Sequence, residues 1–67
     1  MEKLSFGELE ALRMADERAI VTVRGSKFDL LCQGLVDKNL MRHMPMITVH
    51  SNKYVTTVFG KKAIRNP

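Results

Sequence analysis

The side chains that most often perform catalysis or bind metals are few in this sequence, and their spacing suits neither task. His43 and His50 have no further histidine, cysteine or carboxylate at the spacing of a zinc site. Cys32 falls on an apolar helical stripe, where we expect a buried, inert thiol rather than a nucleophile. A nucleophile–base pair, a carboxylate pair and a phosphate-binding glycine loop are all missing. We therefore expect no enzyme activity, no cofactor and no metal site.

The distribution of charged residues along the chain is the feature that points to a binding partner. The 67 residues include eleven Lys or Arg and seven Asp or Glu, for a formal net charge of +4. Residues 1–20 hold three of these cations and five of the acids, whereas residues 21–67 hold eight cations and two acids. An acidic first segment and a basic remainder favour a phosphate or an acidic protein surface as partner. A solvated surface with a mild excess of lysine is the alternative explanation.

Length and composition predict a single globular domain over residues 1–67. Hydrophobic residues make up 45% of the chain and charged residues 27%, which argues against disorder. Since so short a chain builds only a small hydrophobic core, the protein could also be stabilised as a homodimer. No segment approaches the ~20 apolar residues of a membrane span, and the first residues do not resemble a signal peptide. With Cys32 as the single cysteine, we expect a reduced, cytoplasmic protein without a membrane partner.

A capping box indicates where the first helix begins. Ser5 and Glu8 have the S-x-x-E spacing in which each side chain bonds the other residue's backbone N–H, which predicts a helix over 5–17. The short β-branched run 19–23 then predicts a strand. Gly25 follows it as a turn residue.

A second helix is predicted to begin at Ser26, which has Asp29 three residues later as in a capping box. Phe28 and three further apolar residues recur at helical spacing, so we expect Phe28 to face the core. Gly34 either ends this helix or lies inside it, where a close backbone approach would explain the glycine. A helix end near 37–39 is an equal alternative.

The second half of the chain is rich in strand-forming residues. Segments 46–50 and 53–58 predict a β-hairpin whose two-residue turn is 51–52, since Asn tolerates a positive φ. Segment 40–44 is ambiguous between a short strand and an irregular link. Thr57 is expected to cap a last helical turn.

Two segments resemble the back end of a winged helix-turn-helix domain. Leu30–Val36 reads "L-x-x-x-G-L-V", and Tyr54–Ala63 reads "Y-x-x-T-x-x-G-x-x-A". Both patterns are similar to the recognition helix and wing of MarR-like and PadR-like regulators. The resemblance covers roughly residues 26–64 and implies an α+β, winged-helix-like fold with two helices, a short strand and a C-terminal hairpin wing. The chain departs from these families in lacking the helix that they have between the first strand and the recognition helix, since Val23 is followed at once by Arg24, Gly25 and Ser26. Compact winged-helix-like proteins of phage and mobile elements share this feature.

This resemblance implies a small non-enzymatic DNA-binding or DNA-associated regulator, in which the recognition helix enters the major groove and the wing touches the backbone. Only Gln33 is a good base-reading side chain, and the nearby Asp29 and Asp37 would repel phosphate. We therefore expect non-specific, phosphate-led binding. The residues predicted to contact DNA are Arg24, Ser26, Lys27, Gln33, Arg42, Asn52, Lys53, Lys61 and Lys62.

The alternative function is protein docking, as a small inhibitor or adaptor of a larger host machine, against an acidic partner surface. Its interface would combine the basic surface with a soft apolar patch formed by Leu30, Met41, Met44 and Met46. The same methionines could instead fill gaps in a small core. A third possible function is that of a structural subunit of a larger assembly.

Overall fold

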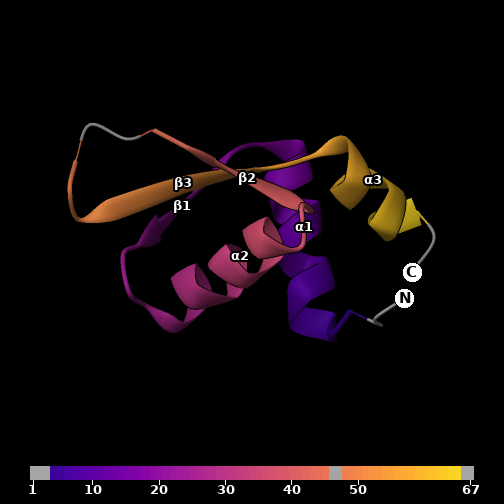
Figure 1. Cartoon of the computed structure of the whole chain (residues 1–67), viewed down its shortest axis with the longest axis horizontal. Coiled ribbons are helices and arrows are strands. Elements are labelled where there is room, and N and C mark those ends of the chain that lie inside the picture. The colour runs from indigo at the N-terminus through magenta and orange to yellow at the C-terminus, as the bar shows by residue number, and fades with distance from the viewer. Residues whose placement is uncertain (1–3, 46–47, 66–67) are drawn as a thin grey trace.

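The protein is a small α+β domain of three helices and one three-stranded antiparallel sheet (Figure 1). The computed structural model describes residues 4–45 and 48–65. The elements follow the order α1 (Phe6–Glu17), β1 (Ile20–Val23), α2 (Lys27–Asp37), β2 (Met41–Met44), β3 (Ser51–Thr56) and α3 (Val58–Arg65). No helix within these described ranges combines the length and hydrophobicity that crossing a membrane requires.

The sheet has the order β1-β3-β2, so β3 is central and the other two strands are edges. Thr22 pairs with Asn52 across β1 and β3, and His43 pairs with Tyr54 across β2 and β3. In Figure 1, α2 lies below the strands and α3 lies at their right-hand end. The Thr56 hydroxyl donates to the Leu12 carbonyl of α1 at 2.7 Å, which ties α1 to the same face of the sheet that α2 covers.

The helix starts follow the predicted capping. The Ser5 N–H donates to Glu8 Oε1 at 2.9 Å and the Glu8 N–H donates to Ser5 Oγ at 3.2 Å, which confirms the capping box. Ser26 Oγ accepts from the Asp29 N–H at 3.1 Å. Thr57 Oγ1 accepts from the Gly60 N–H at 3.2 Å, and the helix that it caps runs on to Arg65. The described residues therefore form three helices, one more than the two of the predicted fold, because the expected last helical turn extends to Arg65.

The core lies between the helices and one face of the sheet. Gly60 is required there, because a Cβ at this position would meet the Leu40 carbonyl oxygen and would lie 2.6 Å from Thr56 Cγ2. No close backbone approach explains Gly34, since nothing lies within 4 Å of a Cβ built on it. The alternative of a helix end near 37–39 is confirmed, because α2 ends at Asp37. The buried apolar residues are Ala11, Leu12, Ala15, Cys32, Leu35, Met41 and Tyr54.

The predicted hairpin was misplaced. The strands are Met41–Met44 and Ser51–Thr56, so the predicted turn at 51–52 is strand instead. Its residues pair with Val23 and Thr22 of β1, and this pairing extends β3 toward its N-terminal side. The predicted strand 46–50 includes Met46 and Ile47, which lie outside the described residues, and Thr48–His50 form a turn.

The orientation predicted for α2 was also wrong in one respect. Phe28 is 38% exposed, whereas the neighbouring Asp29 is fully buried. The buried residues of the helix are Asp29, Cys32 and Leu35, spaced by three. An acid thus occupies the inward position that the apolar pattern assigned to Phe28, because hydrogen-bond donors of the sheet meet it there.

Candidate functional site

Asp29 is the centre of a buried polar cluster that joins α2 to the sheet. Its Oδ1 accepts hydrogen bonds from Thr22 Oγ1 at 2.6 Å, Tyr54 Oη at 2.8 Å and Asn52 Nδ2 at 3.0 Å. Its Oδ2 accepts from Gln33 Nε2 at 2.8 Å and from the backbone N–H of Gly25 at 3.0 Å. Five donors therefore surround a carboxylate with no solvent exposure, which is how a buried charge is tolerated without a counter-ion.

The electrostatics follow from this arrangement. Burial alone would raise the pKa of Asp29, but the hydrogen bonds from Thr22, Gly25 and Asn52 outweigh it and hold the pKa well below the usual value. Burial, together with the hydrogen bond to Asp29, raises the pKa of Tyr54 to about 12. Burial and the nearby Asp29 charge raise the pKa of the Cys32 thiol to about 11. Cys32 is buried as predicted, and none of these groups is activated as a nucleophile or general base at neutral pH.

The cluster includes Gln33, which was expected to read DNA bases, and Asn52, which was expected on the wing. Gln33 gives its amide N–H to Asp29. Asn52 was placed on the wing tip but is only 6% exposed, because Asp29 accepts from its Nδ2. Its Oδ1 accepts from Arg24 Nη2 at 3.3 Å and lies 3.1 Å from His43 Nε2. Asp29 itself, expected beside the DNA surface, presents no carboxylate to a ligand.

The remaining predicted DNA contacts lie on four elements, α2, β2, β3 and α3. Ser26 is half-buried as the N-cap of α2, and Lys27 is exposed beside it. Arg42 and Lys53 belong to the sheet. Lys61 and Lys62 are exposed on α3, where Lys61 Nζ lies 3.7 Å from Asp16 Oδ1 of α1. The structure therefore does not gather all nine residues on one surface.

One face of the sheet carries no helix. Since residues paired across strands share a face, the buried Thr22, Asn52 and Tyr54 mark the covered face, and the residues between them mark the other. We call this second set the open face. It consists of Val21, Val23, Arg42, Met44, Ser51, Lys53 and Val55.

The open face is basic and apolar. Val21 is 57% and Val23 is 69% exposed, and Arg42 is exposed as well. Lys53 is half-buried at its centre, with Val21 directly opposite on β1 and Met44 directly opposite on β2. None of the residues that form β1, β2 and β3 in the described structure is an acid.

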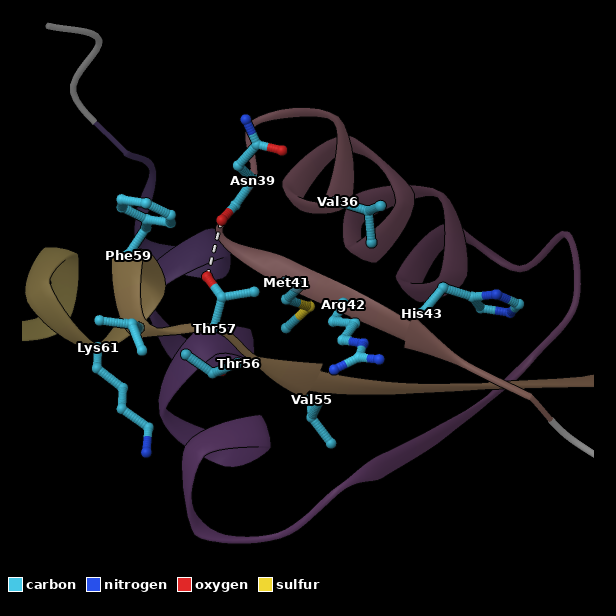
Figure 2. A pocket seen from close by; sticks show the side chains of 11 residues that line it. Val36, Asn39, Met41, Arg42, His43, Val55, Thr56, Thr57, Phe59 and Lys61 are labelled. Atoms are coloured by element: carbon cyan, nitrogen blue, oxygen red, sulfur yellow. Dashed lines mark hydrogen bonds between the residues drawn. The ribbon is translucent and has the colours of Figure 1, made fainter.

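Two shallow hollows adjoin β2. The first has a volume of about 640 Å³ and is lined by residues of β2, β3 and the start of α3, among them Arg42 and Lys61 (Figure 2). The second, of about 370 Å³, is lined by Arg24, Gln33 and Asn52, among others. Val36 and His43 line both hollows, so the two adjoin along α2 and β2. We call the pair the β2 groove.

The predicted protein-docking patch is broken up by the fold. Met41 is 2% exposed and belongs to the core, because its side chain points to the covered face of the sheet. Leu30 is 58% exposed on α2, while Met44 is half-buried on the open face. Met46 lies outside the described residues. Exposed apolar area suitable for a partner is therefore spread over several surfaces rather than gathered in one methionine patch.

Metal binding finds no support in the part of the chain that the structure describes, where no three His, Cys, Asp or Glu side chains come together. His50 is exposed in the connection between β2 and β3. His43 packs against the Tyr54 ring, with centroids 5.4 Å apart.

Sequence reasoning missed Asp29, Thr22 and Tyr54 as a unit. The Ser26–Asp29 spacing offered a local explanation for Asp29 as part of a capping box. In the structure its carboxylate bonds the Gly25 N–H instead of the Ser26 N–H. A usable signal was the run of polar residues at alternate positions of β3, Asn52, Tyr54 and Thr56, which are all buried.

Comparison of the chain with protein-family models, with curated proteins and with solved structures gives no match.

Proposed function

We propose that this domain is a non-enzymatic DNA-binding module that holds the phosphate backbone against the open face of its sheet. The observation that carries the proposal is that Arg42 and Lys53 lie on this uncovered face without an acidic neighbour in the three strands. Basic side chains on a surface free of carboxylates provide the counterion-releasing contacts that dominate non-specific DNA affinity.

The proposed binding is led by phosphate rather than by base sequence. Asn52 is buried and donates its amide to Asp29, and the exposed Gln33 also donates to Asp29. The side chains suited to bidentate base contacts therefore already have a hydrogen-bond partner within the domain. Lys27, Lys61 and Lys62 are exposed cations on the flanking helices and supply further phosphate contacts.

We also propose that the fold is a reduced winged helix, in which α2 has the chain position of the recognition helix and the β2–β3 hairpin that of the wing. Because α2 covers the opposite face of the sheet, it is not the element that holds DNA on the open face. The order of a helix, a strand, a second helix and a hairpin supports this proposal. A role as a small regulator of phage or mobile-element type rests on the same sequence resemblance.

The test is a fluorescence-anisotropy titration of labelled random-sequence duplex DNA at low and at near-physiological salt. We expect the double variant Arg42→Gln/Lys53→Gln to weaken binding and to reduce the slope of log K against log salt by about 2, one for each lost phosphate contact. Arg13→Gln is the matched control, because Arg13 is an exposed cation on α1 with only a weak ion pair to Glu10 at 3.7 Å. It should leave the slope unchanged. Absence of binding at low salt, or an equal loss in the control, would refute the proposal.

A further inference from the structure

One edge of the sheet offers unpaired backbone groups. The Thr57 N–H donates to the Leu40 carbonyl at 3.1 Å, so residues 40 and 57 form a hydrogen-bonded pair of the β2–β3 ladder. Such pairs alternate along an antiparallel ladder, so Arg42 and Met44 direct their backbone groups to β3. Met41 and His43 consequently direct their N–H and C=O groups away from the sheet. Among the described residues, no backbone hydrogen bond links either of them to a segment outside the sheet.

The β2 groove surrounds this edge. Val36 of α2 lies beside the edge on the covered side of the sheet, and Val55 of β3 lies on the open side (Figure 2). Phe59, which is 62% exposed at the start of α3, closes one end of the groove. An extended chain laid along β2 would thus find apolar contacts on both sides as well as backbone partners.

The charged residues around the β2 edge favour a partner segment of opposite charge. Arg24, Arg42 and Lys61 line the groove and Asp37 is the one acid among its lining residues. No carboxylate of the described residues pairs with Arg42. Charged residues on an edge strand discourage pairing between copies of a protein. Two β2 strands paired antiparallel about Arg42 would place two guanidinium groups directly opposite each other.

We propose that the β2 edge binds an extended acidic segment of a partner protein, which adds to the sheet as a fourth strand. A segment that alternates acidic and apolar residues fits best, because alternate side chains of a strand point to opposite faces. The acids would face Arg42 and the apolar residues would face Val36, which is half-buried on the covered side. With four residues in β2, the paired length is on the order of 13 Å. The two proposed sites share Arg42, but the outward backbone groups of β2 belong to this site alone, so variants of the edge separate the two proposals.

The test measures binding of a fluorescently labelled octapeptide that alternates glutamate and valine. Two variants isolate the backbone contacts, since His43→Pro removes the outward N–H of residue 43 and His43→Ala keeps it. Proline is tolerated on edge strands where its nitrogen faces solvent. We expect His43→Pro to bind the peptide at least about tenfold more weakly than His43→Ala, owing to the lost hydrogen bond and the ring's bulk at the edge. Circular dichroism and thermal unfolding establish that both variants fold.

Two further measurements complete the test. Arg42→Gln should weaken peptide binding about fivefold, the size of one exposed ion pair, and a lysine–valine octapeptide should bind more weakly than the glutamate–valine one. His43→Pro should leave the DNA titration unchanged relative to His43→Ala, which separates this site from the open face. Equal peptide affinity of the two His43 variants would overturn the proposal. So would tighter binding of the lysine peptide, or sedimentation showing a dimer that His43→Pro abolishes.

Discussion

Replacing Asp29 by asparagine tests the reasoning about the buried cluster most directly. The substitution keeps the side-chain shape but exchanges one acceptor oxygen for an NH₂ donor. If the NH₂ takes the Oδ2 position, it confronts the Gly25 N–H and the Gln33 amide. If it takes the Oδ1 position, it confronts Asn52 Nδ2, while the two hydroxyls there can turn to accept.

The expected loss is large for a domain of this size. A hydrogen bond to a charged group contributes about 1.5–3 kcal/mol, so losing one or two of them costs about 3 kcal/mol. At about 0.05–0.15 kcal/mol per residue, 67 residues have a total stability of about 3–10 kcal/mol. The Asp29→Asn variant should therefore lose between about a third and all of the domain's stability.

The pH dependence gives the same experiment a second readout. The folded-state pKa of Asp29 is lowered below its ordinary value of 3.8, so the unfolded state binds its proton at a higher pH than the folded state does. Its contribution to stability is fully present above that ordinary value and is lost as the pH falls toward the folded pKa. The stability difference between the wild type and Asp29→Asn should narrow below about pH 4.

Urea unfolding followed by circular dichroism at pH 7 and pH 3 measures both effects. Asp37→Asn is the matched control, because Asp37 is an exposed acid at the end of the same helix. It should change stability by less than about 0.5 kcal/mol. A loss below about 1 kcal/mol in Asp29→Asn, or an equal loss in the control, would show that the cluster does not hold α2 on the sheet.

Two further predictions concern packing and ionisation. Gly60→Ala should lower the free energy of unfolding by about 1–3 kcal/mol, because the added methyl group would meet the Leu40 carbonyl oxygen. Gly34→Ala should raise the free energy of unfolding by about 0.5–1 kcal/mol, since nothing lies within 4 Å of the new Cβ. Urea unfolding measures the change in both glycine variants, and shifts of the same sign and size in the two would contradict the structure. Tyr54 is the only tyrosine and the chain has no tryptophan, so ultraviolet absorbance reports its ionisation alone. With the pKa raised to about 12, phenolate should form at a higher pH in the folded protein than in urea, and coinciding titrations would contradict the burial of its hydroxyl.

The local signals in the sequence predicted the helices well. Ser5, Ser26 and Thr57 each cap the helix that follows, because a side-chain oxygen reaches backbone N–H groups two or three residues away whatever the rest of the fold does. The strand before Gly25 and the burial of Cys32 followed from equally short-range patterns.

The positions of the β2 and β3 strands could not be predicted in this way. Segment 46–50 has the more β-branched composition, yet β2 is the less strand-like Met41–Met44. Strand formation depends on what lies opposite, and β-propensity is strongly modified by pairing and burial. Here the hydrogen bond from Thr57 to Leu40 starts the ladder directly after α2, which sets the register of the hairpin.

For the candidate sites too, some features followed from the sequence and others only from the fold. The sequence by itself determined that the second half of the chain is basic, which is a matter of composition. Only the tertiary structure decided which polar side chains are available to a ligand. The buried Asp29 holds Asn52 in the interior, whereas the strand register places Arg42 and Lys53 on the open face. A charged side chain at an inward helical position is unfavourable from its sequence alone. It becomes favourable when donors from β1, β3 and α2 converge on it, and that convergence of segments distant in the chain exists only in the folded protein.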